Sequence, residues 1–525
     1  MIFRSPYPDI VVPDTPLHTL ILSRAAELAE KPALVDGPSG RTLTYGQLAG
    51  ASRLIASSLV RRGFKKGDVF AIYSPNIPEY ALPILAVSML GGACTGINPL
   101  YTAEELAFQL NDTGATFLVT IPLFMDKAIE AAKHSKVREI FVYGEAEGAT
   151  PFVSLLAGDG QIPDVQINPY DDVVAIPYSS GTTGLPKGVM LTHRSLVANI
   201  LQAGYPLPTN DDDKVLAVLP FYHIYGLTII LGLSLFKGST IVTLPRFDLE
   251  QALQITQDQG ITVAPLVPPI IVALAKHPIV DRFDLSKIKF IGSGAAPLGD
   301  NVERAATARV GTALVQGYGM TETSAATHIN PVDKTRSGSV GVLLPSTLCK
   351  IVDLETGTDL GPRQQGEICV RGPQIMKGYL NRPDATRNMI DYAGWLHTGD
   401  VGYADDDGYF FVVDRVKELI KYNGLQVAPA ELEAVLLANP AIADAAVIPV
   451  PDESAGELPK AFVVLKGETT PDEIMAFVAE RVAPHKKVRL VEIVETIPKS
   501  ASGKILRRVL IEQERAKVAS AAGGA

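Results

Sequence analysis

The chain has 525 residues, of which 47% are apolar and 20% are charged, and its formal net charge is −10. A chain of this length is too long for one hydrophobic core, so two or more domains are expected. The negative charge disfavours a general nucleic-acid binder, and the longest apolar run, Ile224 to Phe236, is shorter than the roughly 20 residues that cross a bilayer.

Short β-rich segments alternate with helical ones from about residue 20 to residue 320, a pattern typical of parallel sheets covered by helices. A helix is expected at Ile77 to Leu90, and strands are expected at Val69–Ser74, Phe117–Thr120, Ile140–Tyr143, Leu216–Leu219, Thr240–Leu244, Val263–Val267 and Lys289–Gly292. From about Lys350, segments separated by Gly and Asp turns indicate antiparallel hairpins at Lys350–Asp353, Gly366–Arg371 and Gly408–Val413.

After Asp414 the pattern changes again, to a small α+β module. Its expected elements are the helices Pro429–Leu437 and Pro471–Val482 and the strands Ala443–Pro449, Ala461–Leu465 and Val491–Val494. The sequence therefore predicts an α/β protein with a large N-terminal domain, residues 1–414, built from helix-covered, mostly parallel β-sheets plus an antiparallel β subdomain. A small α+β C-terminal domain would occupy residues 415–525.

The three cysteines, Cys94, Cys349 and Cys369, are far apart and lack metal-ligand spacing. We expect them to be buried small hydrophobic residues in a reducing compartment. The first ten residues lack the charged start and apolar stretch of a signal peptide, and the last three are not Ser-Lys-Leu. These features predict a cytoplasmic protein.

One stretch, residues 178–188, concentrates hydroxyl groups, glycines and a lysine directly after the apolar segment Val173 to Pro177. Glycines let backbone N–H groups turn toward an anion, hydroxyls add donors, and a lysine adds a point charge. Gly188 after the lysine excludes a Walker A loop. The stretch therefore predicts a different phosphate loop, with Ser179, Ser180, Gly181, Thr182, Thr183, Gly184 and Lys187 as its binding residues.

This loop resembles the AMP-binding signature of the adenylate-forming superfamily, which includes acyl- and aryl-CoA synthetases, beetle luciferases and nonribosomal-peptide adenylation domains. In that superfamily the loop follows the triphosphate of ATP. Further boxes match in order over roughly residues 30 to 510, and together they look most like the 4-coumarate:CoA ligase group of acyl-CoA synthetases.

Two of these boxes are Gly292 to Gly299, where small residues leave room for a flat ring, and Gln316 to Glu322. A tyrosine can stack on a purine, a threonine can hold a phosphate, and a glutamate can hold Mg²⁺. The resemblance assigns Tyr318 to adenine, Thr321 to the α-phosphate and Glu322 to Mg²⁺. The same boxes contribute Gly294, Ala295, Ala296, Gln316, Gly317, Gly319 and Met320 to the implied nucleotide site.

A ribose site is implied by a T-G-D fragment followed by D-R, which match the family pattern and assign ribose binding to Asp400 and Arg415. Between these fragments, residues 366–372 resemble the second signature box of the 4-coumarate:CoA ligases. Cys369 in this box has alternating apolar neighbours, so we expect a packed strand residue and no nucleophile.

The segment Asp414 to Glu431 resembles the family hinge and the start of its mobile domain. Lys417 matches the pivot, while Lys421 and Gln426 match residues that face the reactants in one or other conformation. Asn423 departs from the pattern, because many coumarate ligases carry a lysine there that is assigned to the CoA phosphates. Near the end of the chain, Lys504 matches the catalytic lysine.

The resemblance implies a two-step reaction with ATP, Mg²⁺ and coenzyme A. A carboxylate attacks the α-phosphate to give acyl-AMP and pyrophosphate, and the thiol of CoA then gives acyl-CoA and AMP. No general base is needed in the first step, because the attacking carboxylate is already ionised. The monomer and the homodimer both stay open.

The acyl pocket is implied by His223-Ile224-Tyr225-Gly226-Leu227, which resembles H-I-Y-A-L of the coumarate ligases and places His223 beside the pocket and the thiol tunnel. The expected pocket residues are Tyr225, Ile229, Gly292, Ala295, Gly317 and Ala326. The expected substrate is an aryl acid of the 4-coumarate or cinnamate type. Medium- and long-chain fatty acids stay open, as does transfer to a carrier protein, although the chain has no carrier motif. No separate signal supports a luciferase-like oxygenase.

Overall fold

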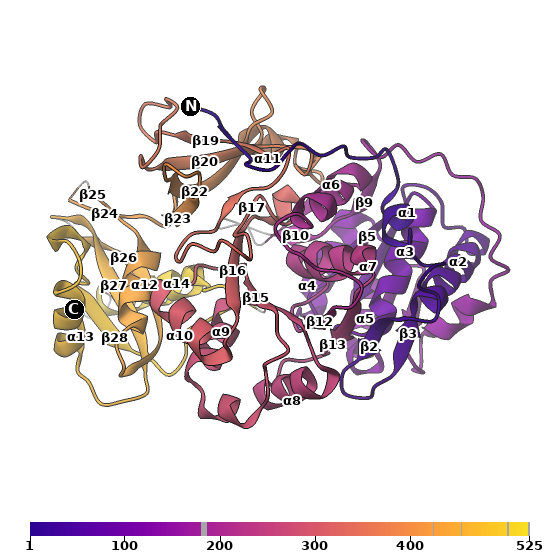
Figure 1. Ribbon diagram of the computed structural model, residues 1–525, viewed down its shortest axis with the longest axis horizontal. Helices are drawn as coiled ribbons and strands as arrows, with labels where there is room; N and C mark the ends of the chain where they lie inside the picture. Colours follow the sequence, from indigo (N-terminus) through magenta and orange to yellow (C-terminus); the bar gives the residue numbers. More distant parts are fainter. Residues whose placement is uncertain (180–185, 424, 453, 501–502, 523–525) are drawn as a thin grey trace.

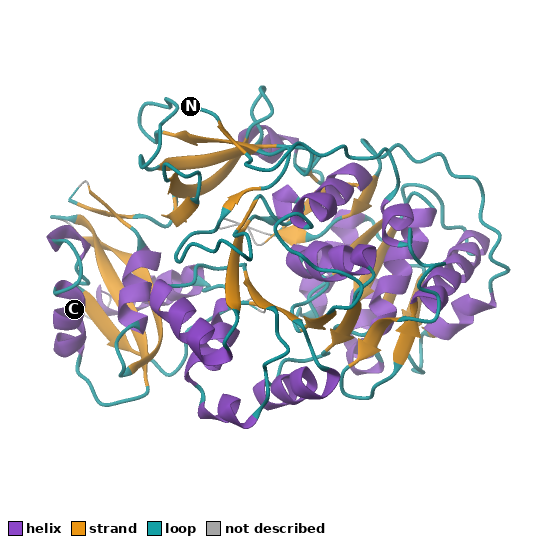
Figure 2. Ribbon diagram, in the orientation of Figure 1, coloured by secondary structure: helices purple, strands orange, loops and turns teal. Residues whose placement is uncertain are grey.

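The computed structural model describes residues 1–179, 186–423, 425–452, 454–500 and 503–522, so the predicted phosphate-loop residues 180–184 lie outside it. Within the described residues the strands form four sheets. Figure 1 shows them coloured by position in the sequence, and Figure 2 shows them coloured by secondary structure. Helices cover the two largest sheets. This mixed architecture is the α/β class that the sequence predicts. Among these residues, none of the helices is both long and apolar enough to cross a membrane.

The first nine-stranded sheet has a parallel centre and an antiparallel edge beside the predicted phosphate loop. Its order is β10 (Tyr178–Ser179), β11 (Lys187–Thr192), β9 (Val173–Ala175), β5 (Ala93–Gly96), β4 (Val69–Tyr73), β6 (Phe117–Thr120), β7 (Glu139–Val142) and β8 (Thr150–Pro151), with β21 (Gly378–Tyr379) joined to β11. Among its helices, α4 (Ala103–Thr113) begins at a capping box of Thr102 and Glu105 and ends at left-handed Gly114.

The second nine-stranded sheet has a parallel centre. In α/β proteins, ligands bind at the carboxyl ends of such parallel strands. Its order is β18 (Val342–Leu343), β17 (His328–Ile329), β16 (Ala313–Tyr318), β15 (Phe290–Ser293), β14 (Val263–Leu266), β12 (Lys214–Ala217), β13 (Thr240–Thr243), β2 (Pro32–Asp36) and β3 (Thr42–Thr44). Strands β16 through β2 in this order pair in parallel.

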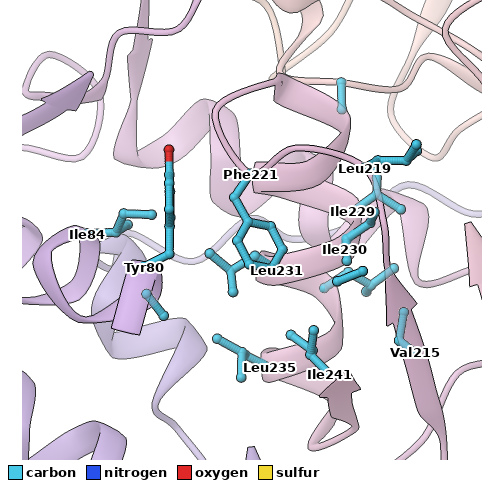
Figure 3. Packing of buried hydrophobic residues seen from close by; sticks show 14 of the residues in the cluster. Tyr80, Ile84, Val215, Leu219, Phe221, Ile229, Ile230, Leu231, Leu235 and Ile241 are labelled. Carbon is cyan, nitrogen blue, oxygen red and sulfur yellow. The ribbon is translucent and has the colours of Figure 1, made fainter. Parts of the chain in front are cut away.

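A π-helix, η4 (Tyr225–Leu233), continues into α7 (Ser234–Lys237) and contacts both β12 and the helix α6 (His193–Ala203). Its apolar residues belong to the largest core of the molecule. Figure 3 shows Ile229, Ile230 and Leu231 of this helix together with Val215 of β12 and Phe221 of the preceding loop. The core thereby fixes the helix against the sheet.

The antiparallel sheet consists of β1 (Phe3–Arg4), β19 (Leu348–Val352), β20 (Gly366–Arg371), β22 (Leu396–Ala404) and β23 (Phe410–Arg415). Its register places Asp400 directly opposite Arg415 and Cys369 opposite His397. The two predicted ribose residues therefore come from neighbouring strands.

The last sheet is formed only by segments after residue 419, and Figure 1 shows it as a separate module at the side of α9 (Pro268–Lys276) and α10 (Asp300–Val310). Its elements are β24 (Ile420–Tyr422), β25 (Leu425–Val427), α12 (Pro429–Leu437), β26 (Ile442–Asp452), β27 (Gly456–Leu465), α13 (Pro471–Ala479), β28 (Leu490–Ile493) and α14 (Arg507–Ala522). Arg507 pairs with Glu433 inside this module and with Glu418 just before it.

Candidate active site

A cavity of about 570 Å³ lies where the two large sheets, the antiparallel sheet and the C-terminal module meet, and its size is that of a small-molecule site. The predicted site residues that line it are Ser179, Lys187, His223, Tyr225, Ile229, Gly292, Gly294, Ala295, Gly317, Tyr318, Gly319, Met320, Thr321, Glu322, Ala326, Arg415, Lys417 and Lys504. The structure thus brings together, around one cavity, residues that are separated by more than 300 positions in the sequence.

The predicted nucleotide end is organised around the Asp400 carboxylate, which is 6% exposed. Tyr318 donates to its Oδ2 at 2.6 Å, and Nε of Arg415 lies 3.2 Å from its Oδ1. Burial raises the pKa of the Asp400 carboxyl, while the Arg415 charge acts in the opposite direction. The predicted adenine and ribose residues are therefore in direct contact.

The predicted metal residue, Glu322, lies in a one-turn helix, η6 (Thr321–Thr323), and is 5% exposed. Tyr379 donates to its Oε1 at 2.7 Å, and within the described ranges its carboxylate pairs with no cation. A buried carboxylate beside a cavity and without a basic partner is a suitable oxygen ligand for a hard divalent ion. The residues present therefore fit Mg²⁺.

Lys504 reaches the cavity from a turn after residue 500, where Gly503 has a φ of 79° that favours glycine. Burial, with a smaller effect of the Arg415 charge, lowers the pKa of Lys504 to about 8. Lys504 thus lines the cavity, and the negative charge of Asp400 attracts its ammonium group.

Besides Asp400, which contacts the cavity-lining Tyr318, four predicted cofactor residues do not line the cavity. Lys421 and Gln426 oppose each other on the β24–β25 hairpin and are exposed. Gln316 is buried and donates to Glu303 Oε2 at 2.6 Å. Ala296 lies beside cavity-lining Ala295 without lining the cavity itself.

The predicted acyl end begins at His223, whose Nδ1 accepts a 3.3 Å hydrogen bond from the N–H of Tyr225. Burial, with a smaller effect of the Lys504 charge, lowers the pKa of His223 to about 4, so its imidazole is neutral at pH 7. The Tyr225 ring lies against Gly294, where an added Cβ would be 3.0 Å from Cε1, and its hydroxyl would be 3.1 Å from a Cβ added at Gly292. A side chain at Gly292 would therefore crowd Tyr225.

The backbone around this site is strained. Ala295, Ser324 and Ala325 have φ values of 71°, 57° and 131°, in the region that favours glycine. Ala295 and Ala325 both line the cavity. The packing around these residues therefore holds their backbone in this strained conformation beside the cavity.

Comparison with known proteins decides the family. The AMP-binding enzyme family matches residues 22–380, and the AMP-binding enzyme C-terminal domain matches residues 431–504. The chain belongs to the AMP-binding enzyme family. This finding confirms the resemblance to adenylate-forming enzymes that the sequence motifs indicate.

Three proteins illustrate how similar this AMP-binding enzyme is to characterised relatives. It is 46% identical to 4-coumarate–CoA ligase 5 of Oryza sativa subsp. japonica, over 99% of this chain and 98% of the relative. It is 44% identical to 4-coumarate–CoA ligase 1 of Petroselinum crispum, over 99% and 97%. The crystal structure of the anthranilate CoA ligase AuaEII in complex with anthranoyl-AMP superposes with a TM-score of 0.90 at 25% identity, over 98% and 99% of the chains. The predicted fold is confirmed.

Sequence reasoning missed several residues of this AMP-binding enzyme that lie at the site. Tyr379 contacts Glu322, and Glu367 and His397 line the cavity, with Glu367 Oε2 lying 2.8 Å from His397 Nδ1. Glu367 lies within the matched box of residues 366–372, but no local signal gave it a place at the site, because β20, β21 and β22 bring these residues together from separate segments. Cys369 is buried, and burial raises the pKa of its thiol, as expected for a packed strand cysteine.

Proposed function

We propose that this chain is an ATP-dependent carboxylate–CoA ligase of the AMP-forming, acid–thiol type, with an aryl acid of the 4-coumarate or cinnamate type as its substrate. The observation that carries the proposal is the convergence of Lys504, the Tyr318–Asp400 pair and Glu322 on one cavity that continues into an apolar pocket. The curated relatives named above act on 4-coumarate, which supports the aryl class.

In the first step a carboxylate oxygen of the acid forms a bond to the α-phosphorus of ATP, and the bond from that phosphorus to the bridging oxygen of pyrophosphate breaks. Negative charge increases on the phosphoryl oxygens as this happens, so fixed cations and donors there lower the barrier. Lys504, Thr321 and Lys187 supply them, and Tyr318, Asp400 and Arg415 orient the nucleoside. Mg²⁺ held by Glu322 would add neutralising charge at the phosphates.

In the second step the sulfur of CoA bonds to the acyl carbon, and AMP leaves with the electrons of the broken C–O bond. The neutral His223 imidazole borders the acyl end and can accept the thiol proton. We propose that residues 415–525 rotate about Lys417, so that Lys504 leaves and the exposed Lys421–Gln426 hairpin turns toward the reactants. The exposure of that hairpin while Lys504 faces the cavity supports this proposal.

A pyrophosphate-release screen tests the function. Aryl acids and aliphatic acids are assayed with ATP and Mg²⁺, with CoA present or absent, and acyl-CoA is identified by mass spectrometry. We expect a burst of pyrophosphate without CoA and continuous turnover with it, fastest for an aryl acid. Turnover with a phosphopantetheinylated carrier protein and none with free CoA would replace the CoA-ligase proposal with a carrier-loading enzyme.

We also place the enzyme in the cytoplasm. Cys94, Cys349 and Cys369 are buried and unpaired, as in proteins of reducing compartments. Cell fractionation with an antibody against the chain measures this directly, and recovery in a secreted fraction would contradict it.

A further inference from the structure

Three side chains with different ligand atoms meet on one face of the antiparallel sheet. Glu367 and Cys369 are two residues apart on β20, and alternate residues of a strand share a face. The pairing of β20 with β22 contains a bulge, because Glu367 lies opposite Val401 whereas Cys369 lies opposite His397. A bulge redirects the side chains beside it, and here the His397 ring contacts both Glu367 and Cys369.

The ligand atoms of this cluster are close enough to share one metal ion. Nδ1 of His397 lies 2.8 Å from Oε2 of Glu367 and 3.4 Å from Sγ of Cys369. One ligand atom of each residue lies within 4.8 Å of the other two. In a tetrahedral zinc site with bonds of about 2.0–2.3 Å, neighbouring ligand atoms are about 3.3–3.6 Å apart. Small side-chain rotations therefore suffice to place an ion between them.

The ligand set suits Zn²⁺ better than Mg²⁺. Thiolate and imidazole ligands favour Zn²⁺, whereas Mg²⁺ prefers oxygen ligands. A Cys369 thiolate and a Glu367 carboxylate together cancel the charge of a divalent ion, which makes a partly buried site tolerable. Burial and the Glu367 charge raise the pKa of the Cys369 thiol, so binding must release the thiol proton to solvent. A coordinating metal ion deprotonates a thiol outright.

The cluster is accessible from the cavity. Glu367 and His397 line the cavity, and their side chains are 18% and 33% exposed, whereas Cys369 is fully buried. An ion can enter from this side, and water can supply a fourth ligand. The second ring nitrogen of His397, Nε2, lies 3.7 Å from Oδ2 of Asp391. A carboxylate beside Nε2 favours a proton on that nitrogen, which leaves Nδ1 for the metal.

A chain of hydrogen bonds joins this cluster to the predicted hinge. Oε1 of Glu367 accepts a 3.0 Å hydrogen bond from the N–H of Gly399, and the carbonyl oxygen of Gly399 accepts one of 2.9 Å from the N–H of Val416. Val416 directly precedes Lys417, the proposed pivot. An ion that fixes the Glu367 carboxylate therefore also restrains the backbone beside the hinge.

We propose that Glu367, Cys369 and His397 form a regulatory Zn²⁺ site, separate from the predicted Mg²⁺ ligand Glu322. The bound ion holds the Glu367 side chain against the backbone beside the hinge and slows the rotation of the C-terminal domain that precedes thiolysis. Zinc binding itself stands on the geometry of the cluster alone. Its effect on the reaction rests on the proposed function and its domain rotation.

Binding is measured on the full-length, metal-free enzyme by titrating Zn²⁺ against a chromophoric chelator in excess Mg²⁺. We expect one ion per chain. Cys369→Ala and His397→Gln should each weaken Zn²⁺ binding by more than about 100-fold, which exceeds the effect of a residue that only orients a ligand. Co²⁺ is the spectroscopic probe, because a cobalt–thiolate bond gives a charge-transfer absorption band that Cys369→Ala should abolish. Thermal unfolding without Zn²⁺ checks that both variants fold.

Cys349→Ala is the matched control, since Cys349 is another fully buried cysteine, lies on the adjacent strand β19 and is outside the cluster. It should keep the wild-type Zn²⁺ affinity and the cobalt–thiolate band. Losses of less than about tenfold in both Cys369→Ala and His397→Gln would overturn the site, as would a cobalt–thiolate band that survives in Cys369→Ala.

The effect on the reaction is measured in single turnovers of each half-reaction at fixed Mg²⁺, with Zn²⁺ present or chelated, for the best acid of the pyrophosphate screen. We expect Zn²⁺ to slow thiolysis by about tenfold, to leave adenylation nearly unchanged, and to lose its effect in Cys369→Ala. Equal slowing in that variant, or Zn²⁺ bound at the cluster with normal thiolysis, would overturn the regulatory role. Absence of acyl-CoA formation from every acid without Zn²⁺ would instead refute the ligase function and leave zinc binding intact.

Discussion

The hydroxyl of Tyr379 donates a 2.7 Å hydrogen bond to Oε1 of Glu322, although the two residues are 57 positions apart. The contact exists because β21 pairs with β11, which brings Tyr379 beside η6. The Nζ atom of Lys187 lies 4.3 Å from the centre of the Tyr379 ring, so this tyrosine also borders the end of the phosphate loop. One ring thereby positions both a carboxylate and a lysine.

Tyr379→Phe removes the hydrogen bond and keeps the ring. Because residues that orient metal ligands contribute to affinity, the Mg²⁺ concentration for half-maximal adenylation should rise by about 10- to 100-fold. Titration of Mg²⁺ at saturating ATP measures this shift. Activity at high Mg²⁺ should largely recover, and an unchanged Mg²⁺ curve would show that Tyr379 is only a packing residue.

Glu322→Gln keeps the shape of the side chain and removes its charge. We expect a larger Mg²⁺ requirement than in Tyr379→Phe and slower adenylation even at high Mg²⁺, since the oxygen ligand itself is weakened. The measurement is pyrophosphate release against Mg²⁺ concentration for both variants. Wild-type rates and metal dependence in Glu322→Gln would refute the metal assignment.

Lys504→Ala should lower adenylation by about 10²- to 10³-fold or more, the loss expected for one transition-state contact. Thiolysis of a supplied acyl-adenylate by CoA should be largely preserved, because the proposed role of Lys504 is confined to the first step. Separate single-turnover assays of the two half-reactions decide the point. Equal losses in both would contradict the role of Lys504.

The pH dependence of adenylation follows from the lowered pKa of Lys504, about 8. The charged form exists below that pH, so the rate should fall as the pH rises through about 8. Lys504→Arg keeps its charge to much higher pH, because an arginine pKa exceeds about 12. The adenylation rate of Lys504→Arg should therefore not fall as the pH rises through about 8. The same fall in rate in wild type and variant would show that another group titrates.

Lys417→Pro tests the hinge. Proline fixes φ near −65° and removes an N–H, so the backbone can no longer adopt two sets of dihedral angles at this point. We expect adenylate formation to survive and acyl-CoA formation to fall sharply in pre-steady-state assays. Wild-type rates in both half-reactions would mean that Lys417 is not the pivot.

Local sequence patterns predicted the bounds of several strands and helices correctly. The predicted strands Phe117–Thr120 and Gly366–Arg371 and the helix Pro429–Leu437 have the observed bounds. The predicted strand Ala443–Pro449 is longer in the structure, Ile442–Asp452, because Pro449 and Pro451 remain within the ladder with β27 and do not end it. Proline terminates most strands, so the extension had no local signal.

The motifs predicted which residues gather at the cavity, as for Tyr318 and Glu322, which line it, and Asp400, which bonds to Tyr318. The contact of Tyr379 with Glu322 was not, because it depends on a strand pairing between residues about 190 positions apart. The π-helical conformation of η4 was also not predicted, because its sequence shows only a run of apolar residues. Long-range packing thus determines which residues surround the motif.

The left-handed backbone at Ser324 bears on how far this enzyme can be made heat-resistant. Ser324 is fully buried with a φ of 57°, and its hydroxyl lacks a partner among the described residues. A non-glycine residue in such a conformation costs about 1 kcal/mol or more. Glycine there would remove both penalties, yet it would also loosen the turn that follows Glu322. Thermal tolerance and a rigid nucleotide pocket are therefore competing demands on a single residue.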